Sequence, residues 1–230
     1  MVVKDRFFKD KKVFITGGTG SLGMALVRRL EKLGSHIVIY SRDEGKQALL
    51  FRDLPNVEKI IGDIRDLDKL TYSISRHHPH YIIHTAALKR IDDMELYPEE
   101  CIKTNIEGSY NVARATQKGV QKCLLISTDK ACQPVNVYGS SKLIAERTFT
   151  NFDYNSRDTI FSSVRYGNVI ASRGSFVPLF MDSIKNEEPI RVTSELMTRF
   201  LFTLDDAVDA VLGSLRHSVG GEVFVPQINS

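Results

Sequence analysis

The segment Val13-Phe-Ile-Thr16 and the loop Gly17-Gly-Thr-Gly-Ser-Leu-Gly23 that follows it decide the fold of this chain. The first segment is short and apolar, as a buried strand is. The loop repeats glycine every third residue. After it, leucines recur at the spacing of one helical face, at Leu22, Leu26, Leu30 and Leu33. A buried strand, a glycine-rich turn and an amphipathic helix in this order are typical of the start of an α/β domain.

The same alternation continues along the chain. We expect five further strands, over residues 36–40, 57–61, 81–85, 122–127 and 159–164. Helices are expected between them, including one over residues 105–118 and one that contains Tyr138. Short strands that alternate with helices predict a parallel sheet covered on both faces, and right-handed crossovers make it doubly wound. The predicted fold class is therefore α/β with a doubly wound parallel sheet.

The pattern loosens after about residue 167. We expect a dinucleotide-binding domain over residues 1–170 and a partial substrate lobe over residues 171–230, interleaved with the sheet. The second part predicts a short helix, a strand over residues 190–193, a helix that begins at Thr203-Leu-Asp-Asp206 and a last strand over residues 222–225. The inward side chains expected on that last helix are Ala207, Val208, Val211, Leu212 and Leu215.

The composition is that of an ordinary globular protein, with 42% hydrophobic and 26% charged residues. The net charge of +3 comes from interspersed charges without a basic, aromatic-rich run, so we expect no nucleic-acid partner. No apolar run reaches the roughly 18 residues of a membrane span, and the N-terminus has no signal-peptide core. We therefore expect a soluble, cytoplasmic protein. Its three cysteines lack a metal-ligand spacing, so no metal site is expected.

The glycine loop predicts a phosphate-binding site. Glycines let the backbone approach a pyrophosphate, and the start of the next helix offers N–H donors and a favourable dipole. A tight turn without a ligand is the alternative. The loop residues that we expect to contact a dinucleotide are Gly17, Thr19, Gly20, Ser21, Leu22 and Gly23.

The end of the second strand indicates which dinucleotide binds. An acidic residue at this point is typical of NAD sites. Here Ser41 and Arg42 offer a hydroxyl and a guanidinium, which suit a 2′-phosphate. The sequence therefore favours NADP over NAD, although Asp43 follows immediately and a shift of one residue would reverse the preference.

Two later strand ends complete the expected cofactor site. Asp63, followed by Ile64, either accepts a hydrogen bond from the adenine amine or only caps a turn or helix. Ala86 and Ala87 follow the fourth strand, where small side chains leave room for the cofactor.

Acid–base groups are concentrated in Ser127-Thr-Asp-Lys-Ala131 and Tyr138-Gly-Ser-Ser-Lys142. On a helix, four-residue spacing places Tyr138 and Lys142 on one face. The ammonium can then hold the phenol toward phenolate, a base for a hydroxyl proton. Alcohol oxidation does not need the adjacent Asp129 and Lys130. They indicate a second chemical step, with a surface ion pair as the alternative.

Together these segments resemble the extended short-chain dehydrogenase/reductases, a Rossmann-fold family. The matching segments are Thr16–Gly23, Asp63–Ile64, Ala86–Lys89, Lys103–Asn105 and Tyr138–Lys142. Further segments narrow the resemblance to the UDP-N-acetylglucosamine 4,6-dehydratases of bacterial polysaccharide and flagellin-glycan pathways. These are Ser41–Glu44, Ser127–Ala131, Arg165–Asn168 and Met197–Phe200.

The resemblance implies a division of labour among five side chains. Tyr138, held by Lys142, takes the proton of the sugar C4 hydroxyl while the C4 hydride passes to NADP, and Thr128 bonds the C4 oxygen. Lys130 then removes the C5 proton, Asp129 helps the C6 hydroxyl to leave, and the hydride returns to C6. Tyr138, where other members have Met, implies inversion at C5.

The resemblance also implies binding residues and an assembly. In addition to the glycine-loop residues and to Tyr138 and Lys142, the resemblance implies that the cofactor is contacted by Lys89, Tyr166, Gly167 and Val169. It places at the UDP-sugar Lys89, Asn168, Arg173, Thr193, Met197 and Arg199. Members continue for roughly a hundred residues beyond this length in a domain of this type, so the sugar lobe is expected to be partial. A homo-oligomer is implied. The alternative functions are a UDP-sugar 4-epimerase and a non-catalytic NADP-binding protein.

Overall fold

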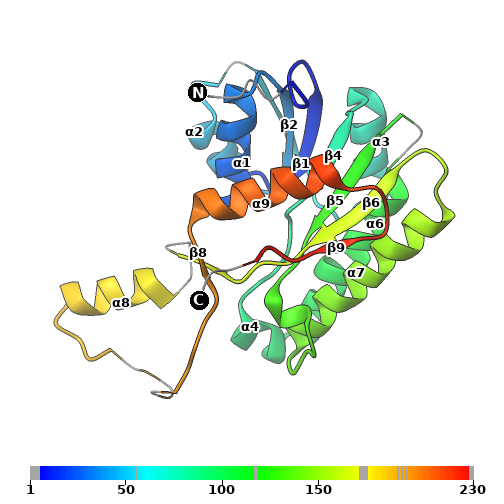
Figure 1. The fold of residues 1–230 in the computed structure, drawn as a ribbon. Coiled ribbons are helices and arrows are strands. Elements are labelled where there is room, and N and C mark those ends of the chain that lie inside the picture. The colour runs from blue at the N-terminus through cyan, green and yellow to red at the C-terminus, as the bar shows by residue number, and fades with distance from the viewer. Residues whose placement is uncertain are drawn as a thin grey trace.

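A seven-stranded parallel sheet forms the centre of the computed structural model, in the order β3-β2-β1-β4-β5-β6-β9 (Figure 1). The structure describes residues 6–54, 56–116, 119–170, 176–190, 192, 194 and 196–227. The strands are β1 (Lys12–Thr16), β2 (His36–Ser41), β3 (Val57–Ile61), β4 (Tyr81–His84), β5 (Lys122–Ile126), β6 (Ile160–Val164) and β9 (Val223–Phe224). The order reverses between β1 and β4, and ligands of such sheets bind at the carboxyl ends beside that point.

Helices cover both faces of this sheet. The helices of the described chain are α1 (Ser21–Lys32), α2 (Glu44–Leu50), α3 (Leu67–His77), α4 (Ile91–Leu96), α5 (Pro98–Cys101), α6 (Gly108–Ala115), α7 (Val137–Asn155), α8 (Phe176–Lys185) and α9 (Leu204–His217). Of these, α8 projects away from the sheet (Figure 1). A π-helical stretch, Ile102–Glu107, joins α5 to α6, and a 3₁₀ turn, Asp129–Ala131, follows β5. A separate two-stranded sheet pairs β7 (Asn168–Val169) with β8 (Leu201–Phe202).

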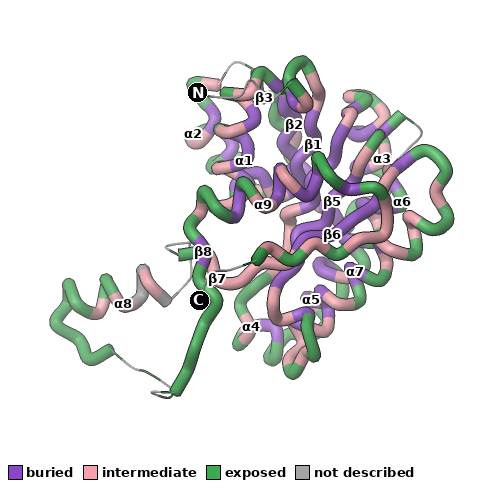
Figure 2. The backbone as a smooth tube through the Cα atoms, in the orientation of Figure 1, coloured by how far each residue is buried: buried purple, intermediate pink, exposed green. Residues whose placement is uncertain are grey.

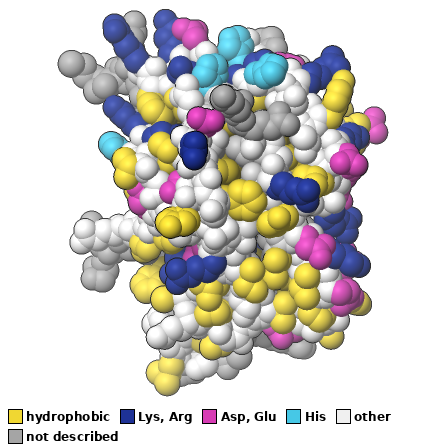
Figure 3. All heavy atoms as spheres, turned by 90° about the vertical axis from the view of Figure 1, so that its right-hand side faces the viewer, with side chains coloured by type: hydrophobic (Ala, Val, Ile, Leu, Met, Phe, Trp, Pro, Cys, Tyr) yellow, Lys and Arg dark blue, Asp and Glu magenta, His cyan; other side chains and the backbone are white. Residues whose placement is uncertain are grey.

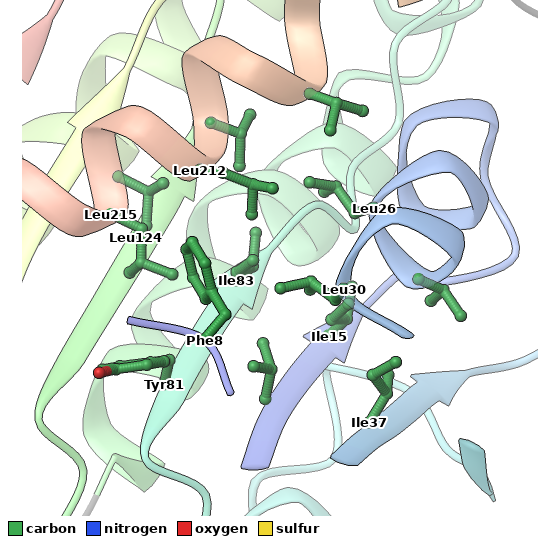
Figure 4. Packing of buried hydrophobic residues seen from close by; sticks show 14 of the residues in the cluster. Phe8, Ile15, Leu26, Leu30, Ile37, Tyr81, Ile83, Leu124, Leu212 and Leu215 are labelled. Carbon is green, nitrogen blue, oxygen red and sulfur yellow. The ribbon is translucent and has the colours of Figure 1, made fainter. Parts of the chain in front are cut away.

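Alternation along the strands builds two apolar layers. In β1, Val13 and Ile15 point to the layer under α1 and α9, and Phe14 points to the layer under α3, α6 and α7. Figure 4 shows leucines of α1 and α9 lying over the first face of the sheet, and Figure 2 shows the buried residues concentrated in the strands. The leucines labelled there are Leu26, Leu30, Leu212 and Leu215.

The second part of the chain completes this core. Thr203 and Asp206 form the predicted capping box, and the five predicted inward side chains of α9 are all buried. Lys122 fixes the other end of α9, because its Nζ donates to the carbonyls of Arg216 and Ser218 at 2.9 and 2.8 Å. No helix in the described part of the chain is both long and apolar enough to cross a bilayer.

The predicted α/β class is confirmed, and each of the six strands before residue 165 is present within one residue of its expected bounds. Two elements were predicted wrongly. The helix expected to begin at Asn105 begins at Pro98, where proline at the first position and the acidic Glu99 and Glu100 favour a helix start; residues 117 and 118 lie outside the description.

The strand expected over residues 190–193 is the second error, since neither Ile190 nor Val192 is in a strand. Residues 191 and 193 lie outside the described chain. A strand needs a hydrogen-bonded neighbour, and the small sheet is built instead from β7 and β8, which were not predicted.

Gly213, in the interior of α9, offers a direct stability test. A Cβ built there meets no atom within 4 Å, so Gly213→Ala should raise the free energy of unfolding by about 0.5–1 kcal/mol through lower backbone entropy of the unfolded chain. Gly139→Ala in α7 is the opposite control, because its Cβ would lie 2.2 Å from the carbonyl oxygen of Lys130. Urea unfolding should give opposite signs; destabilisation by Gly213→Ala would contradict the packing of α9.

Candidate active site

The loops after β1 and β4 approach each other too closely for side chains. Gly17 has a φ of +71°, and a Cβ there would lie 2.8 Å from the Cα of Ala86. A Cβ on Gly23 would lie 2.5 Å from the carbonyl oxygen of Gly17. These two glycines therefore fold the loop into a tight cradle at the reversal point of the sheet.

The cradle leads directly into the N-terminus of α1. Gly20 is the N-cap residue and has no side chain to accept from the first N–H groups of the helix, and the first turn holds no acidic residue. Gly20 is exposed, Thr19 is buried, and Ser21 and Leu22 are half-buried. The N–H groups at a helix start fit the pyrophosphate of a dinucleotide.

The two charged residues after β2, Arg42 and Asp43, have different surroundings. Arg42 is exposed and lies 3.7 Å from Asp63, whereas Asp43 caps α2 by accepting from the backbone N–H of Lys46 at 2.9 Å. Asp43 also pairs with the Lys46 ammonium. The Ser41 hydroxyl, at the last position of β2, accepts from Gln47 at 2.8 Å. The carboxylate is thus directed into α2.

Asp63 closes a turn after β3, the simpler of its two predicted roles. Its Oδ1 accepts from the backbone N–H of Arg65 at 3.0 Å, and the Arg65 guanidinium donates to its Oδ2 at 2.8 and 2.9 Å. Burial raises the pKa of Asp63, but hydrogen bonds and charge from Arg65, with the charge of Arg42, bring the net pKa below its usual value. Ile64 beside it is buried.

Tyr138 and Lys142 lie on the first two turns of α7, whose N-cap is Asn136. Burial raises the pKa of Tyr138 to about 12, against the effect of a hydrogen bond with Thr128. Burial lowers the pKa of Lys142 to about 8, while the charge of Glu146 opposes that shift. The phenol is therefore protonated at neutral pH and needs a neighbouring cation to act as a base.

Thr128 connects this pair to Asp129 and Lys130. Its hydroxyl donates to Oδ1 of Asp129 at 2.8 Å and opposes the rise in the pKa of Tyr138. The Lys130 ammonium lies 3.1 Å from the same Oδ1 and donates to Oδ1 of Asn168 at 3.1 Å. Thr128, Asp129 and Lys130 thus form one hydrogen-bonded group with Asn168, and α7, which carries Tyr138 and Lys142, packs against their turn.

The small sheet delivers Asn168 to this cluster. The backbone N–H of Asn168 donates to the carbonyl of Phe200 at 2.7 Å, and a Cβ on Gly167 would lie 2.3 Å from that same carbonyl oxygen. The Tyr166 carbonyl accepts from the N–H of Asp129 at 3.1 Å, and burial raises the pKa of the Tyr166 phenol. Val169 follows in β7.

Two other predicted sugar-binding residues, Met197 and Arg199, lie beside each other. Arg199 donates to the carbonyl of Thr198 at 2.7 Å and approaches the sulfur of Met197 at 4.0 Å, and both predicted side chains are exposed. Lys89 is exposed after β4, next to the half-buried Ala86 and Ala87. The predicted Arg173 and Thr193 lie outside the described residues.

Asn105 in the π-helical stretch was not given its own role by the sequence. Its amide donates to the Leu88 carbonyl at 2.9 Å and to the Ser141 hydroxyl at 3.1 Å, while its oxygen accepts from the Leu88 N–H at 2.8 Å. It therefore ties the loop after β4 to α7, beside Lys142. The signal that could have identified Asn105 is a polar residue within a predicted helix that packs beside the helix of Tyr138 and Lys142.

His84, at the end of β4, is a second unpredicted member of the surroundings. Its Nδ1 lies 2.7 Å from the Thr16 hydroxyl and its Nε2 lies 3.0 Å from the Ser109 hydroxyl. The Ser109 hydroxyl donates to the Asn105 carbonyl, so Nε2 carries the proton of a neutral ring. Burial, and secondarily the charge of Lys142, lower the pKa of His84 to about 3.

This buried ring predicts acid sensitivity. His84 is neutral in the fold, so its contribution to stability is complete above pH 6.5, its ordinary pKa, and is lost progressively as pH falls toward about 3. His84→Gln should lower stability at neutral pH but flatten the loss between pH 6.5 and 4. Chemical unfolding at several pH values measures this, with the exposed His36→Gln as control. An unchanged slope in His84→Gln would refute the assignment.

Comparisons with known proteins show which family this chain belongs to. A family model described as "Polysaccharide biosynthesis protein" matches residues 13–230. The chain is 43% identical over 232 residues to the inverting UDP-N-acetylglucosamine 4,6-dehydratase of Campylobacter jejuni subsp. jejuni serotype O:2, covering 97% of this chain and 69% of the relative. It is also 42% identical over 228 residues to a UDP-glucose 4-epimerase of Rickettsia bellii, covering 95% of this chain and 66% of that relative.

A solved structure gives the same picture. The X-ray structure of Pen from Bacillus thuringiensis superposes with a TM-score of 0.91 at 40% identity, and the match covers 95% of this chain and 71% of that one. The chain thus spans about two thirds of the length of the curated relatives that it matches.

Proposed function

Because the chain belongs to the polysaccharide biosynthesis protein family, within the extended short-chain dehydrogenase/reductases, we propose that it is a C5-inverting UDP-N-acetylglucosamine 4,6-dehydratase. The observation that carries the proposal is the position of Thr128, whose hydroxyl donates to Asp129 at 2.8 Å and acts on the pKa of the Tyr138 phenol. One pair of groups suits oxidation, the other suits elimination, and a single hydroxyl connects them.

The oxidation step uses Tyr138 and Lys142. The Lys142 ammonium lowers the cost of forming the Tyr138 phenolate, which takes the proton of the C4 hydroxyl. Thr128 orients the C4 oxygen. A nicotinamide dinucleotide, when bound in the glycine cradle, supplies a reversible acceptor for the C4 hydride and a donor for C6.

The elimination step uses the second pair. A C4 ketone acidifies the C5 hydrogen, and Lys130 removes it as a base. Asp129 protonates the departing C6 hydroxyl, so that water leaves and a C5–C6 double bond forms. The contacts of Lys130 with Asp129 and Asn168 hold its ammonium at the cluster until it exchanges a proton.

We further propose NADP as the cofactor, because Arg42 is the exposed cation after β2 while Asp43 is directed into α2. Arg42→Ala should therefore weaken NADP binding about tenfold or more and leave NAD binding nearly unchanged, since only NADP carries the 2′-phosphate. Calorimetric titration of both dinucleotides measures the ratio, with Arg52→Ala as an exposed control. Equal weakening of both would count against NADP selectivity.

A UDP-sugar 4-epimerase is the second candidate, favoured by the similarity to the Rickettsia enzyme. Epimerisation returns the hydride to C4 and has no use for Asp129 and Lys130. Incubation with UDP-N-acetylglucosamine in deuterated water separates the candidates by mass spectrometry and proton NMR. Loss of water with deuterium at C5 supports the dehydratase, whereas a galacto isomer of unchanged mass supports the epimerase. Dinucleotide binding without turnover would indicate a non-catalytic binding protein.

We also propose that the protein forms a homo-oligomer and acts in the cytoplasm. Hydrophobic side chains gather on the lower half of the face in Figure 3, the side of α6 and α7, and exposed apolar residues there include Tyr110 and Ile144. A cytoplasmic location fits the free thiols of Cys101, Cys123 and Cys132, which reducing conditions maintain.

A further inference from the structure

Glu146 is a buried carboxylate that neither proposed step uses. It follows Lys142 by one turn of α7, so that Tyr138, Lys142 and Glu146 form a stripe at four-residue spacing. Its side chain is only 2% exposed. A charge at this depth is costly unless it is paired and hydrogen-bonded, so its partners indicate what it does.

Those partners come from two strand ends. The Ser127 hydroxyl, directly after β5, donates to Oε1 of Glu146. Arg165, directly after β6, donates from Nε to Oε1 at 2.8 Å and from Nη2 to Oε2 at 2.6 Å. Glu146 is thus the point at which α7, β5 and β6 are joined by polar contacts, and bidentate pairing fixes their relative orientation.

The same contacts reach the turn that carries the elimination pair. Nη2 of Arg165 also approaches the carbonyl of Ala131, the last residue of the 3₁₀ turn, at 3.5 Å. Both ends of the segment Ser127–Ala131 are therefore held by the pair Glu146–Arg165. The other stripe residues, Tyr138 and Lys142, lie on the same rigid helix as Glu146.

We propose that Glu146 is a positioning residue that holds the Ser127–Ala131 turn against α7, so that Asp129 and Lys130 reach the sugar that Tyr138 and Lys142 oxidise. This inference rests on the proposed function. It adds a contact that aligns the side chains of the elimination step with those of the oxidation step. A buried ion pair is a poor source of net stability compared with apolar packing, whereas its fixed geometry suits the alignment of two separate sets of groups.

The carboxylate also acts on Lys142 through charge. The titratable groups that interact with Lys142 through charge are Glu146 on α7, the Cys101 thiol on α5 and the His84 ring on β4. Burial lowers the pKa of Lys142 to about 8, and the charge of Glu146 opposes this shift. Without that charge, Lys142 would lose its proton at a lower pH, and the support for the Tyr138 phenolate would go with it.

Two substitutions separate the effect of the length of the Glu146 side chain from the effect of its charge. Glu146→Gln keeps the length and loses the charge, so the alkaline limb of the pH profile of C4 oxidation should move to lower pH. Glu146→Asp keeps the charge and shortens the reach. The alkaline limb of this variant should stay in place. Because the Ser127–Ala131 turn is displaced, elimination should slow about tenfold or more relative to oxidation, and reduced cofactor should accumulate. Glu58→Gln on β3 is the matched exposed control.

Readouts on the dinucleotide-free protein keep this test independent of the proposed function. Carbon NMR of labelled lysine should show a lower pKa for Lys142 in Glu146→Gln, and hydrogen exchange at residues 128–132 should accelerate in Glu146→Asp. The positioning role would be overturned by two results together. Glu146→Gln would show the wild-type alkaline limb and the wild-type pKa of Lys142, and Glu146→Asp would show the wild-type ratio of elimination to oxidation and the wild-type rate of hydrogen exchange. If wild type releases no dehydrated product while these shifts occur, the proposed function fails and the positioning of the turn stands.

Discussion

Replacing Lys130 by methionine is expected to abolish dehydration while C4 oxidation persists. We propose that Lys130 removes the C5 proton, and loss of a positioned base costs about 10²- to 10⁴-fold in rate. Tyr138, Lys142 and Thr128 keep their places on α7 and after β5, so reduced cofactor should form and accumulate. Deuterium incorporation at C5, followed by NMR, and the absorbance of reduced nicotinamide measure the two steps separately.

The exposed Lys69→Met on α3 serves as the control and should behave as wild type. An equal loss of oxidation and elimination in Lys130→Met would count against its role as the C5 base, and would indicate that it holds Asn168 and the small sheet in place instead. Circular dichroism and thermal unfolding would then show the structural loss.

Replacing Gly23 by alanine is the second change with a large expected effect. The added Cβ would lie 2.5 Å from the Gly17 carbonyl oxygen and 2.7 Å from the Gly18 Cα, and neither backbone atom can move without opening the cradle. Overpacking of this kind costs about 1–3 kcal/mol of stability. Because the N–H groups of the loop move with it, dinucleotide affinity should fall tenfold or more.

Gly45→Ala in α2 is the matched control, since its Cβ would lie 3.7 Å from the nearest neighbour, an ordinary contact. Calorimetric titration of the dinucleotide and urea unfolding measure both effects. Wild-type affinity in Gly23→Ala would show that the cradle does not form the phosphate site.

The sheet could be predicted because each of its strands carries its own signal. The apolar run of β1 and the leucines of α1 need no knowledge of distant residues. The start of the helix before Asn105 was missed because the π-helical stretch interrupts the 3.6-residue period there. The pairing of β7 with β8 was missed because each strand has two residues, too few for a pattern.

The site was predictable where spacing alone brings groups together. Tyr138 and Lys142 are four residues apart on a helix, and Asp129 and Lys130 are adjacent. The contribution of Glu146 could not be deduced in the same way, because it depends on pairing with Arg165, which follows β6. Such contacts exist only after the sheet has formed.

The position of α9 has a consequence for synthesis of the protein. The apolar face of β1, β4 and β5 is covered by residues as late as Leu212 and Leu215, and Arg29 of α1 pairs with Asp209, 180 residues away. A growing chain therefore carries an open apolar face until α9 leaves the ribosome, when residues far apart in sequence can close it. Nascent chains of this protein are for that reason expected to depend on chaperones that hold apolar surfaces, and to aggregate when translation stalls before residue 204.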